Sequence, residues 1–83
     1  MNMAWYVYIG GNPNAVTSYT LVQVQPPCLN GTILCAILAP FGPNNRPASI
    51  PAGLQTNIAN ALATGVAQPQ PIPPLQPEVL LRD

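Results

Sequence analysis

The chain has 83 residues and a formal net charge of zero, because it carries only two basic and two acidic side chains and no histidine. Charged residues make up 5% of the sequence, against roughly 25% in an average soluble domain. So few basic side chains exclude the electrostatic surface that binds nucleic acid or an anionic membrane, and a chain without net repulsion is expected to associate.

We interpret residues 1–83 as a single domain whose first part, 1–39, is β-rich. Strands are expected in three segments rich in β-branched and aromatic residues, 4–9, 16–25 and 32–39. The third segment is apolar on both faces, which is typical of a central strand covered on both sides.

A helix is expected over 49–65, with Ser49 as its N-cap and Gly65 as its C-terminal stop. Its apolar residues recur at helical spacing, at Ile50, Leu54, Ile58, Ala61 and Leu62. The segment 68–77 holds five prolines and predicts polyproline II, and a final strand is expected over 78–82.

This order of elements predicts a small α+β fold. It would have a three- to four-stranded, mainly antiparallel sheet, one helix on one face of that sheet, and a polyproline II tail. Apolar residues on the other face of the first and third strands would then lack cover within the chain.

The two cysteines, Cys28 and Cys35, follow a C-x6-C spacing that differs from the C-x-x-C redox motif. A local disulfide is the favoured interpretation, and two buried free thiols acting as small apolar residues are the alternative. A disulfide favours an oxidising compartment, so we expect an extracellular or cell-surface protein. The first residues lack the basic and apolar regions of a signal peptide.

Two further features are candidate sites. Asn30-Gly31-Thr32 fits the N-x-S/T acceptor sequence for glycosylation, although an ordinary hairpin turn also explains Asn-Gly. Trp5, Tyr6, Tyr8 and Tyr19 could form an aromatic ligand surface, but packing in the core or between subunits is favoured. The candidate interface residues are Trp5, Tyr6, Tyr8, Tyr19, Val79, Leu80 and Leu81.

The residue inventory argues against an enzyme. A nucleophile needs a neighbouring base, but the chain has no histidine or lysine, and its only carboxylate side chains are those of Glu78 and Asp83. Zinc sites usually need four ligands, and no Gly-rich phosphate loop precedes a helix. We therefore expect no cofactor, no metal and no transmembrane span.

Several short motifs occur along most of the chain: Ala4-Trp5-Tyr6, Ser18-Tyr19-Thr20, Pro27-Cys28, Cys35-Ala36-Ile37 and Val79-Leu80-Leu81-Arg82. In these motifs and in its helix the chain resembles a group of short Bacteroidota proteins to which no activity is assigned, so the resemblance implies no catalytic residue. The chain departs from that group in its Pro- and Gln-rich insert before the last strand and in its few charges. These departures suggest adaptation to assembly or to a coated surface.

The sequence therefore favours a structural subunit of a self-assembling extracellular homopolymer, such as a filament, whose main partners are copies of itself. A small carbohydrate- or protein-binding module is the alternative, with glycans as further partners. A virion decoration protein is a third reading that the sequence does not separate from the first.

Overall fold

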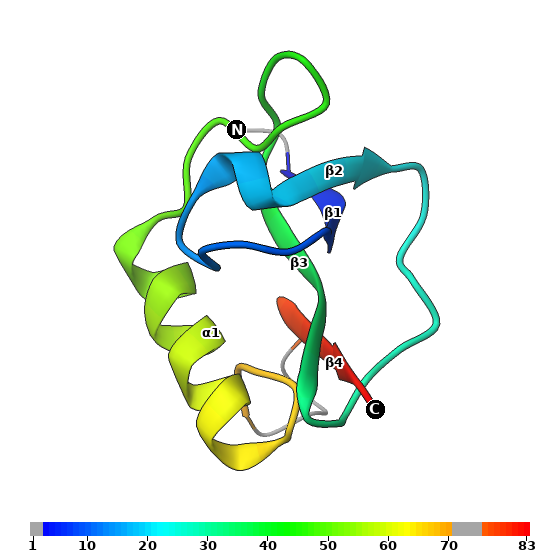
Figure 1. Ribbon diagram of the computed structural model, residues 1–83, viewed down its shortest axis with the longest axis vertical. Helices are drawn as coiled ribbons and strands as arrows, with labels where there is room; N and C mark the ends of the chain where they lie inside the picture. Colours follow the sequence, from blue (N-terminus) through cyan, green and yellow to red (C-terminus); the bar gives the residue numbers. More distant parts are fainter. Residues whose placement is uncertain (1–2, 71–75) are drawn as a thin grey trace.

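The computed structural model describes residues 3–70 and 76–83. Within them the chain forms an α+β fold of four antiparallel strands and one α-helix, as the sequence predicts. The elements in chain order are β1 (Met3–Tyr8), the 3₁₀ turn η1 (Val16–Ser18), β2 (Tyr19–Val22), β3 (Ile33–Pro40), α1 (Ala52–Thr64) and β4 (Val79–Arg82). The strand order is β2-β1-β3-β4, so β2 and β4 form the two edges of the sheet (Figure 1).

The register of the strands divides the apolar side chains between the two faces of the sheet. Tyr6 lies opposite Leu21 of β2 and Ile37 of β3, whereas its neighbour Trp5 lies opposite Val22 and Leu38. Because successive residues of a strand point to opposite faces, the tyrosine row and the tryptophan row belong to different sides. Only the tyrosine row packs with the helix.

The larger core lies between this helix face and α1. Tyr6, Tyr19 and Ile37 have no exposed surface and pack with Leu54 and Ile58 of the helix. Burying each aliphatic side chain of this core, such as Ile37, Leu54 or Ile58, contributes about 1.5–3 kcal/mol, so the seam between helix and sheet contributes substantially to stability.

A second, smaller cluster lies on the opposite face of the sheet. It consists of the fully buried Ala36, Ala67 and Leu80, against which Cys28 packs. Part of the cover comes from Cys28, in the crossing connection 23–32 that leads from the edge strand β2 to β3 (Figure 1), and part from Ala67, which follows the helix. The expected lack of cover therefore holds only for the part of the face that these segments leave open.

The expected strand 16–25 is shorter in the structure and extends only over Tyr19–Val22. Its first residues instead form η1, because Ser18 donates its hydroxyl to the Asn12 carbonyl (2.6 Å) and its amide to the Ala15 carbonyl (3.1 Å). Such local bonds compete with a strand ladder. Beyond Val22 the chain leaves the sheet, and Val24 is 73% exposed.

The helix begins later than expected. Pro51 occupies the N-cap position in place of Ser49, and α1 starts at Ala52. Gly65 ends the helix in the left-handed conformation, at φ 73°, as the sequence predicts. The predicted apolar stripe is buried except for Leu62, which is 43% exposed at the margin of the contact with the sheet.

The polyproline II prediction for 68–77 falls largely outside the described residues. The part that is described begins with a β-bridge between Gln68 and Val79. The final strand is present as β4 and pairs antiparallel with β3.

Candidate functional site

The outer edge of β2 is covered by the loop that follows β3. The Leu21 amide donates to the Asn45 carbonyl (2.9 Å), and the Arg46 guanidinium donates to the carbonyls of Thr17 (3.0 Å) and Tyr19. Asn44 and Asn45 adopt left-handed conformations, with φ 60° and 61°, which asparagine tolerates better than most residues. Arg46 therefore occupies acceptors that a neighbouring strand would otherwise use.

The outer edge of β4 is covered by two separate pieces of chain. The Leu81 amide donates to the Leu29 carbonyl (2.9 Å), and Val79 exchanges hydrogen bonds with Gln68 (3.0 and 3.2 Å). The side chain of Asn30 joins the two pieces by accepting a hydrogen bond from the Ala67 amide (2.9 Å). Together they behave as a discontinuous fifth strand, so neither edge of the sheet is an open template for strand addition.

Asn30-Gly31 does not form a hairpin between neighbouring strands, because β2 and β3 are not adjacent in the sheet. Instead, its backbone packs closely against the ends of α1 and β4. The Gly31 amide donates to the Gly65 carbonyl (3.1 Å). A Cβ atom on Gly31 would lie 2.2 Å from the carbonyl carbon of Arg82. Glycine is therefore required by the approach of the two backbones.

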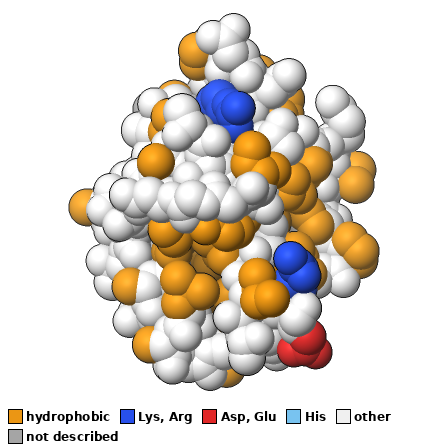
Figure 2. All heavy atoms as spheres, viewed as in Figure 1, with side chains coloured by type: hydrophobic (Ala, Val, Ile, Leu, Met, Phe, Trp, Pro, Cys, Tyr) orange, Lys and Arg blue, Asp and Glu red, His pale blue; other side chains and the backbone are white. Residues whose placement is uncertain are grey.

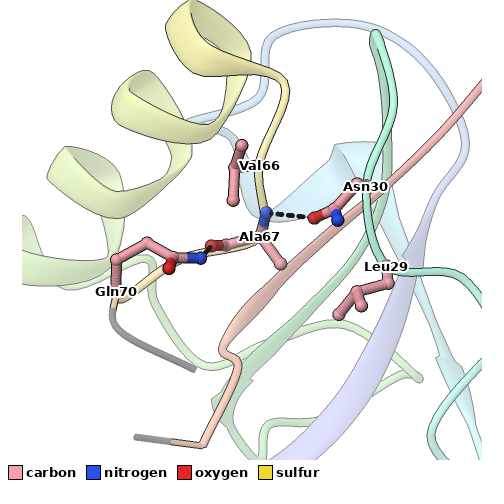
Figure 3. Close-up of a pocket in the computed structure, with 5 residues that line it drawn as sticks. All are labelled: Leu29, Asn30, Val66, Ala67 and Gln70. Carbon is pink, nitrogen blue, oxygen red and sulfur yellow. Dashed lines mark hydrogen bonds between the residues drawn. The ribbon is translucent and has the colours of Figure 1, made fainter. Parts of the chain in front are cut away.

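A pocket of about 230 Å³ lies beside Asn30. Leu29 and Asn30 line it on one side, and Val66, Ala67 and Gln70 line it on the other (Figure 3). The Gln70 side chain donates to the Ala67 carbonyl (2.6 Å) and so belongs to the wall. The pocket is smaller than the ~300–1,000 Å³ clefts that enclose drug-sized ligands.

The predicted disulfide between Cys28 and Cys35 is present, with a Cα–Cα distance of 6.7 Å. It links the crossing connection to β3 at the point where the pairing of β3 with β4 is irregular, between Leu34 and Ala36. Because Cys28 also packs in the second cluster, the bond holds the crossing connection against the face that it covers.

Trp5 and Val7 pack against the margin of this second cluster. Together with Val22 and Leu38, their half-buried side chains define what we call the open face. Trp5 stands between Val22 and Leu38 in one cross-strand row. None of the four charged residues of the chain lies in this row. Charges are also sparse elsewhere: Figure 2 shows isolated basic (blue) and acidic (red) side chains among hydrophobic side chains (orange) and uncharged polar or backbone atoms (white).

The predicted interface residues do not form one surface. Tyr6, Tyr19, Val79, Leu80 and Leu81 have no exposed surface, so their side chains belong to the core and are not available to a partner. Tyr8 is half-buried on the helix face, where its hydroxyl donates to the Gly11 carbonyl. Among the four aromatic residues only Trp5 lies on the open face, because strand alternation separates it from the tyrosines. The alternative of a four-residue aromatic ligand surface is therefore not assembled, and Tyr6 and Tyr19 pack in the core.

Burial gives Tyr19 a pH-dependent role in stability. Desolvation by burial, and next the neighbouring Tyr8, raise the pKa of the Tyr19 phenol above its usual range. Tyrosine titrates near 10 in an unfolded chain, so above about pH 10 the unfolded state loses this proton while the folded state keeps it. We expect the free energy of unfolding to fall by up to about 1.4 kcal/mol per pH unit there.

Urea denaturation between pH 8 and about pH 11.5 measures this fall. In Tyr19→Phe the slope should be shallower, although the variant also loses the hydrogen bond from the Tyr19 hydroxyl to the Pro13 carbonyl. An equally steep slope in Tyr19→Phe would assign the effect to other groups.

The chain matches no family model, no curated protein and no solved structure. Among residues 3–70 and 76–83, no helix combines the length and apolar character that crossing a bilayer requires.

Proposed function

We propose that the protein is a non-catalytic structural subunit that associates with copies of itself outside the cell or at its surface. The observation that carries the proposal is the open face, where Trp5, Val22 and Leu38 form an apolar row without a charged residue. Each side chain of this row is half-buried, so part of its apolar surface stays accessible, and a contiguous apolar patch on a small protein commonly marks an interaction site.

The properties of the chain favour a second copy as the occupant of this face. The net charge is zero, so two copies do not repel each other at long range. A two-fold pairing would place the same row on both partners, and Trp5 would be its aromatic anchor. Because hydrogen bonds within the chain cover both edges of the sheet, association through the face is favoured over strand addition.

A filament also needs a second contact, since a single two-fold interface closes into a dimer. Phe41, which is 56% exposed, and Leu62 on α1 are exposed apolar side chains outside the open face. We propose that Phe41 and Leu62 contribute to this second contact. The disulfide supports the extracellular or cell-surface location, because such bonds persist in oxidising compartments.

The test compares the same substitution inside and outside the open face. Val22→Lys would bring like charges together across the pairing, whereas Val24→Lys places the charge on an exposed residue of the crossing connection. We expect Val22→Lys to weaken association at least about tenfold, equivalent to 1.4 kcal/mol, and Val24→Lys to leave it nearly unchanged. Sedimentation over a range of concentrations measures association, and negative-stain images show its form.

Two outcomes would count against the proposal in different ways. A wild-type chain that stays monomeric at high concentration would overturn self-association altogether. Association that survives Val22→Lys, in a variant whose urea transition shows it to be folded, would retain self-association but remove the open face as its site.

A further inference from the structure

The proposed association leaves one sequence motif without a role, the Asn30-Gly31-Thr32 acceptor sequence. The chain has eight asparagines, and only Asn30 is followed two positions later by serine or threonine. The structure places Asn30 at an exposed position. We propose that the Asn30 side chain is a site of N-linked glycosylation and that the pocket beside it receives the first sugar ring.

The hydrogen bonding of Asn30 is compatible with this modification. Its Oδ1 accepts from the Ala67 amide, and among the described residues its Nδ2 has no acceptor. Glycosylation converts the primary amide into a secondary amide, which keeps its carbonyl oxygen. The bond to Ala67 therefore survives, and the link between the two pieces that cover β4 is retained.

The transfer uses a lipid-linked sugar donor, a polyprenyl-pyrophosphate oligosaccharide. A bond forms between Nδ2 of Asn30 and C1 of the first sugar, and the bond between C1 and the pyrophosphate oxygen breaks. The amide proton passes to a base of the transferase, and polyprenyl pyrophosphate leaves. Because Ala67 lies 37 residues after Asn30, the acceptor is free of its native partner until the later part of the chain has folded.

The pocket offers the kind of surface that a sugar ring contacts. Leu29 and Val66 are exposed apolar side chains on opposite walls; in Figure 3 Leu29 lies on the same side as Asn30, and Val66 lies across from it. The volume of about 230 Å³ is below the range of clefts that enclose drug-sized ligands, so the pocket is offered to the first ring alone and not to the whole glycan. An attached glycan would also supply the hydration that a surface with so few charges lacks.

The test measures the intact mass of the full chain purified from its own source, before and after treatment with an amidase that releases N-glycans. We expect a mass above that of the sequence, which falls on treatment as Asn30 is converted to aspartate. Thr32→Ser, made in the same host, should keep the added mass, and Thr32→Ala should lose it.

Thr32→Ala is the matched control because it removes the acceptor sequence and leaves the Asn30–Ala67 bond untouched. The Thr32 contact that shapes the fold is made by its backbone amide, which donates to the Arg82 carbonyl (2.9 Å). A wild-type mass equal to that of the oxidised sequence would overturn the proposal, as would added mass that persists in Thr32→Ala. Neither result bears on self-association through the open face.

Discussion

Reduction of the Cys28–Cys35 disulfide is expected to lower the free energy of unfolding by about 2.5 kcal/mol. The bond closes a short loop, with a sequence separation of 7, and the chain-entropy relation gives this value for a loop of that size. A domain of this length has a total stability of roughly 4–12 kcal/mol. Reduction therefore removes a large share of it.

Urea denaturation of the oxidised and reduced chains measures this loss, and Cys28→Ala combined with Cys35→Ala serves as the control. The double variant should resemble the reduced chain and should no longer respond to reductant. Equal transition midpoints for the oxidised and reduced chains would contradict the prediction.

The loss should also be visible locally. The disulfide holds the crossing connection, whose Leu29 carbonyl accepts from the Leu81 amide. In the reduced chain we expect that amide to exchange its hydrogen faster relative to the Tyr6 amide in the central strand β1. Uniform acceleration of all amides would instead mean that reduction weakens the whole fold without releasing this connection.

The sequence predicts those parts of the fold that short-range patterns determine. Alternation in β1, the doubly apolar run of β3, the apolar stripe of the helix and its stop at Gly65 all follow from neighbouring residues. The order of these elements is sufficient to predict an α+β fold. The same alternation predicts that Trp5 lies on the opposite face of the strand from Tyr6 and Tyr8, as the register confirms.

The covers of the two sheet edges could not be predicted in this way. The Arg46 guanidinium contacts carbonyls 27 and 29 residues earlier in the chain, and Asn30 contacts Ala67 across 37 residues. Such contacts depend on where loops meet after the sheet has formed. Glycines that only fill a close approach, such as Gly31, likewise resemble turn residues in the sequence.

Arg46→Ala is expected to destabilise the fold and to open the edge of β2. Hydrogen bonds to charged groups contribute about 1.5–3 kcal/mol when they are well shielded, but Arg46 is only half-buried. We therefore expect a loss of about 1–2 kcal/mol in the free energy of unfolding. The carbonyls of Thr17 and Tyr19 lose their donor, which leaves the edge able to accept a strand from another chain.

The second arginine of the chain provides the control. Arg82 is exposed, and its guanidinium donates only to the carbonyl of the adjacent Asp83 within the described residues, so Arg82→Ala should change stability by less than about 0.5 kcal/mol. Denaturation measures the stability of both variants, and thioflavin fluorescence reports strand-mediated aggregates, which only Arg46→Ala should form. If the two variants behave alike, Arg46 does not protect the edge. Negative-stain images of Arg46→Ala would show whether its aggregates replace the assembly formed by the wild-type chain. If they do, association through the open face and strand pairing at the edge of β2 compete, and Arg46 favours the former by covering that edge.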